Sequence, residues 1–214
     1  MLNKIKTLTK KGGFTLMEML VVVAIFGILS AILMFNYGNF SDSTLSTNIA
    51  YEVALQIREA QVFGLGVRGS GSTFSDSFDN AYGVYVNVPV GSDSNTVIFF
   101  LDANTDTECD GAGGAACSCS GDPTDECVDS KTLPQGIKFT DLRVYDGVAC
   151  KEINSLAVSF KRPNPDALIR MNGDPTAYQA AQIEITAPRS GDKRYVIVRD
   201  NGQISVSRDT ICSV

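Results

Sequence analysis

The chain has 214 residues, a formal net charge of −6 and no histidine. This length suffices for one buried core, while the missing histidine removes the side chain that most often performs acid–base catalysis near neutral pH. An acidic chain also repels phosphates, so we expect neither an enzyme nor a protein that coats nucleic acid nonspecifically.

Residues 1–13 form a short basic segment, followed by an apolar run that begins at Phe14. Glu18 is the only charged residue between Phe14 and Asp42. The run over residues 14–37 is long enough to predict a helix that crosses a membrane once. The basic segment predicts a cytoplasmic N-terminus by the positive-inside rule, with the rest of the chain outside. Its charges are all lysines: Lys4, Lys6, Lys10 and Lys11.

An ordinary signal peptide or a simple anchor explains this segment poorly. Signal peptides are cut after the apolar region next to small residues, and residues 35–42, FNYGNFSD, contain no such pattern. A carboxylate within an apolar helix costs about 2.5–3.5 kcal/mol on insertion scales. Glu18 therefore indicates an interaction partner.

The segment KKGGFTLMEMLVVVAIFGILSAI, residues 10–32, resembles the N-terminus of type IV pilins and of the pseudopilins of type II secretion systems. The resemblance implies that a prepilin peptidase cuts after Gly13 and that the new N-terminus at Phe14 is methylated. It also implies that Glu18 pairs with the Phe14 amine of a neighbouring subunit, which lowers the cost of both charges in a low dielectric. The partners would then be other pilin or pseudopilin subunits and an assembly platform in the cell inner membrane.

Residues 38–63 are predicted to continue the helix toward a head domain. Gly38 has Asn36 and Asn39 beside it, and these poor helix formers predict a flexible or partly unwound stretch where many family members have a proline. Beyond it an apolar residue recurs every four positions, which predicts an amphipathic helix that packs on the protein's own core. These residues are Leu45, Ile49, Val53 and Ile57.

Residues 64–214 are predicted to form a β-rich head outside the cytoplasm. Gly64 to Asn80 reads as a loop, and Asn201-Gly202 as a hairpin turn in which both residues can take positive φ. A long helix followed by a mostly antiparallel sheet gives an α+β, pilin-like fold. The predicted strands are Tyr82–Val88, Thr96–Leu101, Gly136–Val144, Ser155–Lys161, Gln182–Thr186, Arg194–Arg199 and Gln203–Ser207.

A long insert, residues 102–129, has eight acidic residues, no basic ones and four cysteines. Asp102, Asn104 and Asp106 alternate like the opening of a calcium loop, and two further acidic residues, Glu108 and Asp110, continue the series. Position six is Thr107 rather than Gly, and position twelve is Gly113 rather than Glu. The pattern thus favours a solvent-exposed acidic loop without a cofactor, with calcium in another geometry as the alternative.

The six cysteines form an even set, which suits disulfide bonds in an exported domain. The four in the insert are not arranged as paired C-x-x-C motifs, so disulfides are favoured over a thiolate metal site. A bridge between Cys117 and Cys119 would be strained, which predicts that each pairs with Cys109 or Cys127. Cys150 with Cys212 would then tie the chain end to the sheet.

Two further segments resemble the minor-subunit branch of the family, which contains type II secretion protein H and the FimT-like minor pilins. They are REAQVFGLGVR at 58–68 and SFKRPNPDA at 159–167, although Arg162 to Pro165 alone also reads as a rigid surface turn. The resemblance implies a minor pilin or pseudopilin. It also suggests an alternative, DNA capture during natural transformation, for which residues 189–208 supply five basic residues against two acidic ones. Strand alternation does not bring these basic residues to one face, so the filament subunit is favoured.

Overall fold

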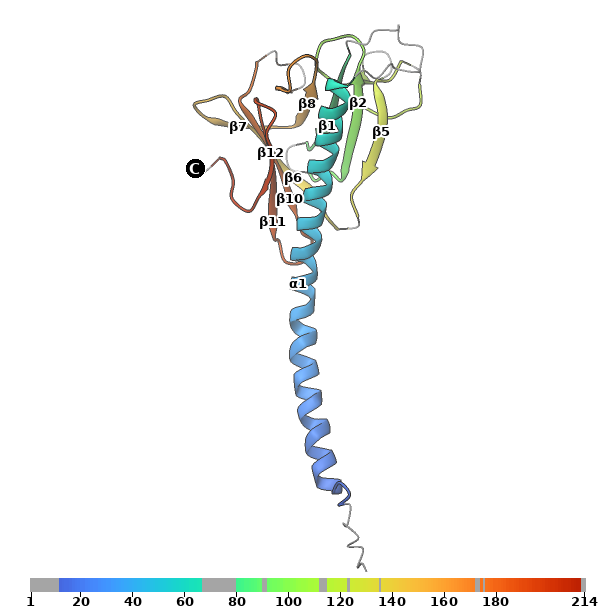
Figure 1. Ribbon diagram of the computed structural model, residues 1–214, viewed down its shortest axis with the longest axis vertical. Helices are drawn as coiled ribbons and strands as arrows, with labels where there is room; N and C mark the ends of the chain where they lie inside the picture. Colours follow the sequence, from blue (N-terminus) through green and yellow to red (C-terminus); the bar gives the residue numbers. More distant parts are fainter. Residues whose placement is uncertain are drawn as a thin grey trace, which may run out of the picture. The chain divides into compact units, whose positions relative to one another are not determined.

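The computed structural model describes residues 12–66, 80–89, 92–111, 115–122, 124–134, 136–171, 174 and 176–212. The chain divides into two compact units, Met1–Phe40 and Ser41–Val214. One α-helix, α1, spans Leu16–Leu65 and has 50 residues (Figure 1). The four leader lysines lie outside the described residues, as does most of the loop predicted between Gly64 and Asn80.

Helix α1 is continuous through Gly38, so the predicted unwound stretch is wrong. A single glycine costs a helix only about 1 kcal/mol relative to alanine. A break would leave several backbone groups without partners, and each unpaired buried group costs as much or more. The helix also extends to Leu65, beyond the predicted start of the loop at Gly64.

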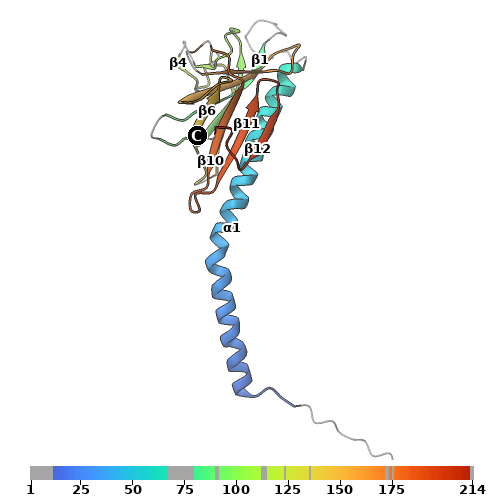
Figure 2. The same ribbon diagram turned by 90° about the vertical axis from the view of Figure 1, so that its left-hand side faces the viewer.

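Within the described residues, the head contains two five-stranded antiparallel sheets and one two-stranded sheet (Figures 1 and 2). Sheet A has the order β5-β2-β1-β8-β9, and sheet B has the order β12-β11-β10-β6-β7. The strands are β1 Ala81–Asn87, β2 Thr96–Asp102, β3 Asp110–Gly111, β4 Ala115–Ala116, β5 Cys127–Thr132, β6 Lys138–Tyr145, β7 Cys150–Ile153, β8 Ser155–Phe160, β9 Ala167–Arg170, β10 Ala180–Thr186, β11 Lys193–Arg199 and β12 Ile204–Ser207.

The α+β prediction is confirmed, and each of the seven predicted strands is present within two residues at either end. The strands that sequence reasoning missed lie mostly at sheet edges. Strand β5 has five exposed residues out of six, and β7 has three exposed residues out of four. Edge strands with so little burial carry no alternating apolar pattern by which they could be recognised.

As predicted, the apolar stripe of α1 packs on the protein's own core, to which both sheets contribute. Ile49, Val53 and Ile57 are at most 4% exposed and belong to the main core, and Leu45 packs at its margin. The helix passes so close to β8 that a Cβ on Gly64 would collide with the carbonyl oxygen of Phe160. The close packing of the helix end on β8 therefore requires glycine at position 64. Gly64 belongs to the helix for this reason and does not begin the loop.

A second, smaller core lies on the other face of sheet A. Tyr85, Ile98 and Phe100 point into it, together with the buried Cys109. Residues of the cysteine-rich insert therefore cover this face, while α1 packs on the main core. Because both faces of the sheet are covered, six of the seven residues of β1 are buried.

The hairpin between β11 and β12 is present, but only Gly202 has positive φ, at 77°. The N–H of Gly202 donates to the carbonyl of Arg199, which closes the four-residue turn Arg199–Gly202. Gln61 of α1 donates to the carbonyls of Gly202 and Pro165, both at 3.1 Å. The hairpin and the Pro-rich turn are thus fixed to the same position on the helix.

Candidate assembly site and surfaces of the head

The predicted cleavage point lies immediately before the start of α1. Gly13 and Phe14 are exposed, and the helix begins at Leu16. The Thr15 hydroxyl accepts a hydrogen bond from the Glu18 N–H at 3.2 Å, which makes Thr15 the N-cap. A cut after Gly13 would therefore place the Phe14 amine next to the first helical turn, which contains Glu18.

Thr15 was not singled out from the sequence, although a signal was present. Thr15-x-x-Glu18 is the pattern of a capping box, and Phe14 and Met19 occupy the positions of a hydrophobic staple. The positive end of the helix dipole disfavours an ammonium group at this end and favours a carboxylate. The carboxylate of Glu18 is therefore favourable at this end of the helix.

Apart from Glu18 and Ser30, residues Leu16–Met34 are apolar on all sides of the helix, and none of the stretch is buried. This stretch of 19 residues has a mean hydropathy of 2.6, which is long and apolar enough to cross a membrane. A helix without a polar face cannot be stable when exposed to water. These side chains need either lipid or other apolar helices around them.

The head exposes a separate apolar stripe on the outer side of α1. Tyr51, Leu55 and Val62 are 56%, 68% and 58% exposed. Spacings of four and seven residues put them on one side of the helix, away from the residues that enter the core. Exposed apolar residues aligned in this way form a candidate contact surface.

Two of the five basic residues proposed for DNA contact are already engaged. The Lys193 ammonium lies 2.8 Å from Glu184, and the hydrogen bond to this carboxylate raises the pKa of Lys193. Arg194 is 2% exposed and bonds to Asp192, Thr47 and Ser43. The local charge available to a phosphate backbone is thus smaller than the sequence suggests.

Residues of this turn also fasten the β10–β11 connection to the helix. Asp42, which is 6% exposed, accepts the backbone N–H groups of Arg189 and Ser190, both at 3.0 Å. Such charge-assisted bonds are stronger than neutral ones. Part of the basic segment therefore serves to join α1 to sheet B within the head.

The three residues considered for calcium lie close together at the end of β2. The Asp102 carboxylate accepts the N–H groups of Thr105 at 2.6 Å and Thr107 at 3.0 Å. The Asn104 side chain donates to Asp106 and to Asp110, both at 2.9 Å. Within the described residues no group of three or more acidic, cysteine or histidine side chains is disposed to hold a metal ion.

The expectation of a solvent-exposed acidic loop is wrong for three of its carboxylates. Asp102, Asp125 and Glu126 are at most 7% exposed, because backbone and side-chain donors surround them. Glu126 accepts the N–H of Ala103 at 2.8 Å and that of Asp110 at 3.0 Å. It thereby joins the two ends of the turn that follows β2, a role with no signal in the local sequence.

Burial raises the pKa of Glu126 to about 7, with the carboxylates of Asp102 and Asp110 adding to the effect. A raised pKa means that the folded chain holds a proton that the unfolded chain releases between about pH 4.5 and 7. We therefore expect the head to lose stability as the pH rises through this interval, by an amount of order 1–3 kcal/mol.

The measurement is the urea midpoint of the chain in detergent between pH 4.5 and 8, followed by the near-UV signal of its tyrosines. Glu126→Gln should flatten the dependence, because the amide does not titrate. Glu108→Gln, which changes a neighbouring carboxylate, serves as the control. An unchanged pH dependence in Glu126→Gln would contradict the assignment.

The structure contains three disulfides, and no described cysteine is free. Cys109 pairs with Cys117 and Cys119 pairs with Cys127, each across eight residues, while Cys150 pairs with Cys212 across 62 residues. The sequence left open which outer cysteine each member of the C-x-C motif would choose. The two short bridges close the insert into a compact lobe over sheet A.

The comparisons with known proteins bear on the N-terminal segment. No curated protein and no solved structure matches this chain. Residues 8–34 match the family model described as the prokaryotic N-terminal methylation motif. The matched region covers the predicted cleavage position after Gly13, the cap at Thr15, Glu18 and the apolar part of α1. The chain therefore carries a type IV pilin-like prepilin signal.

Proposed function

We propose that this chain is a minor pilin or pseudopilin, a non-catalytic subunit of a type IV pilus or of a type II secretion filament. The observation that carries the proposal is the methylation motif at residues 8–34 together with the exposed apolar helix Leu16–Met34. A signal of this kind implies processing by a prepilin peptidase and assembly with other pilins. The head would lie outside the cytoplasm, where its three disulfides are stable.

The chemistry of assembly follows from the first turn of α1. Cleavage after Gly13 frees the Phe14 amine, which is then methylated and stays positively charged. Glu18 of one subunit receives the amine of a neighbour, because an isolated carboxylate in hydrocarbon is costly and an opposite charge offsets that cost. The assembly platform in the inner membrane would bring the subunits together.

Two features of the head support a filament subunit. The stripe of Tyr51, Leu55 and Val62 offers an apolar surface to a neighbour. The disulfide lobe adds an irregular acidic surface over sheet A, which suits a subunit present in few copies better than one that must repeat along a filament. DNA capture is not favoured, since Lys193 and Arg194 are engaged within the head.

The test is mass spectrometry of the membrane form purified from cells with an active prepilin peptidase. The chain should begin at Phe14 and carry a methyl group on its amine. Gly13→Trp should block the cut almost completely, while membrane insertion continues. A Cβ on Gly13 meets no other atom, so the folded structure gives no reason for the block other than recognition by the peptidase.

Gly27→Ala is the matched control, because a Cβ there also meets open space and lies away from the cut. This variant should be processed like the parent. Recovery of a native membrane form that still begins at Met1 would overturn the proposal.

A further inference from the structure

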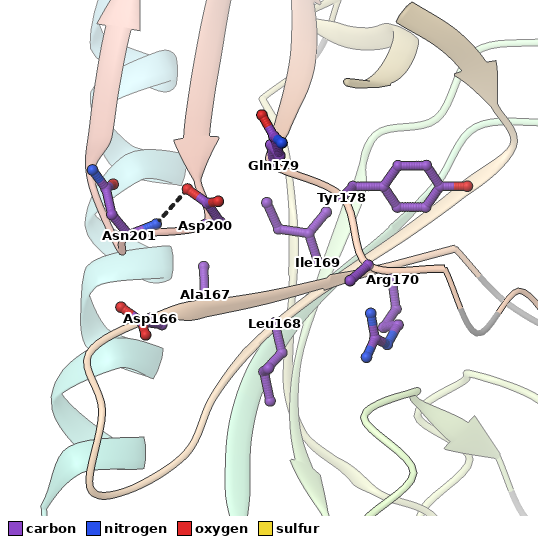
Figure 3. Close-up of a pocket in the computed structure, with 10 residues that line it drawn as sticks. Asp166, Ala167, Leu168, Ile169, Arg170, Tyr178, Gln179, Asp200 and Asn201 are labelled. Atoms are coloured by element: carbon purple, nitrogen blue, oxygen red, sulfur yellow. Dashed lines mark hydrogen bonds between the residues drawn. The ribbon is translucent and has the colours of Figure 1, made fainter. Parts of the chain in front are cut away.

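Sheet A ends in β9 on one side and in β5 on the other. The edge of β9 is covered by the chain that follows it (Figure 3). Ala167 donates its N–H to the carbonyl of Asp200 at 2.7 Å, and Met171 pairs with Asp174 in an isolated bridge. Ile169 lies between these two contacts in the strand and is 1% exposed. This edge of the sheet is therefore closed.

The edge of β5 differs, because every residue from Val128 to Thr132 is exposed. The N–H of Leu133 donates to the carbonyl of Asn95 at 2.6 Å, so Leu133 directs its backbone groups toward the chain that enters β2. Neighbouring residues of an antiparallel strand direct these groups to opposite sides. Thr132 therefore presents its N–H and its carbonyl on the side of β5 that faces away from β2.

A cavity of about 320 Å³ lies between β5 and helix α1. All its lining residues belong to the compact unit Ser41–Val214. Its apolar wall consists of Val53 of α1, Val97 of β2 and Leu133, which are at most 7% exposed. Thr132 lines the same cavity. The volume lies within the range of pockets that bind small ligands.

A buried hydrogen-bond acceptor in this cavity has no partner. Gln56 of α1 lines the cavity and is 9% exposed. Its Oε1 atom is buried and accepts no hydrogen bond from any residue in the described part of the chain. Buried polar atoms are almost always hydrogen-bonded, so an occupant that brings a donor to Gln56 is expected.

The solvent side of the cavity holds one positive and one negative charge. Lys131 and Glu52 line the cavity, and their side chains are 50% and 53% exposed. The ammonium lies 3.9 Å from the carboxylate, which is longer than a hydrogen bond. The two charges offset each other, so this side favours neither a cation nor an anion. Lys131 and the Thr132 N–H can donate to a carbonyl, while Gln56 can accept from an N–H. The complementary group is an uncharged amide.

We propose that this cavity binds an uncharged amide that carries a small aliphatic group. The amide N–H donates to Gln56 Oε1, its carbonyl accepts from Lys131 or from the Thr132 N–H, and the aliphatic group packs on the apolar wall. Small carboxamides contain such a group, and so does an extended peptide segment. The site lies within the head and does not depend on the filament role.

The test uses the full chain in detergent micelles with isotope-labelled threonine, and it follows the amide resonance of Thr132. Isobutyramide should shift this resonance in a saturable way, with a Kd in the millimolar range expected for a ligand of this size. Methyl isobutyrate has the same aliphatic group but no N–H. It should bind at least about fivefold more weakly, because it cannot donate to Gln56.

Variants of the protein locate the acceptor. Gln56→Met keeps the length of the side chain and removes its oxygen. This variant should bind isobutyramide and methyl isobutyrate with similar affinity. Gln203→Met makes the same change at an exposed glutamine just before β12 and should keep the preference for the amide.

A pentapeptide blocked at both ends, Thr-Val-Asn-Val-Thr, identifies the source of the amide. Its asparagine carries an uncharged amide, and the backbone beside it can pair with Thr132 along the exposed edge of β5. Binding about tenfold tighter than that of isobutyramide, lost on methylation of the valine amides, would assign the site to an extended segment of a partner protein. Binding no tighter than that of isobutyramide would assign it to a free small amide.

Three results would overturn the proposal in a chain whose near-UV spectrum shows a folded head. These are no shift of the Thr132 resonance in isobutyramide at about 0.1 M, equal binding of the ester, and an unchanged preference for the amide in Gln56→Met. The first would mean that the cavity holds water only, and the other two that Gln56 is not the acceptor. None of them would affect the processing of the N-terminus, so failure here is distinguishable from failure of the filament role.

Discussion

Glu18→Val is expected to abolish or strongly reduce entry into filaments while leaving cleavage and membrane insertion intact. In an isolated membrane helix the change is favourable, because it removes a carboxylate that costs about 2.5–3.5 kcal/mol in hydrocarbon. Any loss of assembly must then come from an interaction that exists only between subunits. The pairing of Glu18 with the Phe14 amine of a neighbour is that interaction in our proposal.

The measurement compares the variant and the parent in sheared filaments and in membranes, with the N-terminus read by mass spectrometry in both. Glu59→Val is the matched control, since Glu59 is an exposed glutamate on the same helix but within the head. It should be incorporated like the parent. Normal processing of Glu18→Val with unchanged incorporation would reject the pairing mechanism.

The capping geometry allows a second comparison at the same end of the helix. The Thr15 hydroxyl accepts a hydrogen bond from the Glu18 N–H. Loss of such an N-cap typically destabilises a helix by about 1 kcal/mol. That is less than the cost of leaving a charge unpaired in hydrocarbon. Effects of Glu18 that exceed those of Thr15→Val would therefore come from the carboxylate itself rather than from fraying of the first turn.

Periodicity predicted the parts of this fold that are buried on one face or on both. The stripe from Leu45 to Ile57 and the apolar strands of the head repeat apolar residues with the period of a helix or of a strand. These elements could therefore be predicted without a structure. The division into two sheets could not be read in this way, because it depends on which strands pair across long stretches of sequence. Strand β9, for instance, pairs with the preceding β8, while β10 pairs with β6.

Some residues of the candidate sites can likewise be found from the sequence, and others are brought together only by the fold. Gly13, Phe14 and Glu18 are neighbours in sequence, and a local motif identifies them. Glu126 acts on Ala103 and Asp110, which lie 23 and 16 residues away, so only the folded chain brings them together. The backbone bonds of Gln179 to Tyr145 and Asp200 likewise join stretches that are far apart in the sequence, so they have no local signature.

Among the disulfides, removal of Cys150–Cys212 is expected to destabilise the head most. This bridge spans 62 residues, whereas each of the other two spans eight. A cross-link restricts the unfolded chain more when its loop is longer, which gives about 4 kcal/mol for the long loop and about 2.5 kcal/mol for each short one. The difference of about 1.5 kcal/mol is large enough to appear in urea midpoints.

Hydrogen bonds of the C-terminal segment also predict that loss of the Cys150–Cys212 bridge has the largest effect on stability. Gln182 of β10 is 2% exposed, and its side-chain oxygen accepts the Thr210 hydroxyl at 2.8 Å and the Ile211 N–H at 2.9 Å. These bonds hold the last described residues over sheet B next to Cys212, which is itself buried. If the tail detaches when the bridge is lost, Gln182 loses both partners, and the destabilisation exceeds that of loop entropy alone.

The experiment compares three paired Cys→Ala variants of the full chain in detergent by urea unfolding, with tyrosine near-UV signals as the probe. We expect the Cys150/Cys212 pair to be the least stable, followed by the two short-loop pairs at similar midpoints. Gln182→Leu, which removes the tail bonds but keeps the bridge, separates the two contributions. A urea midpoint for the Cys150/Cys212 variant equal to or above those of the short-loop variants would contradict this prediction. The longest loop would then not contribute most to the stability of the head.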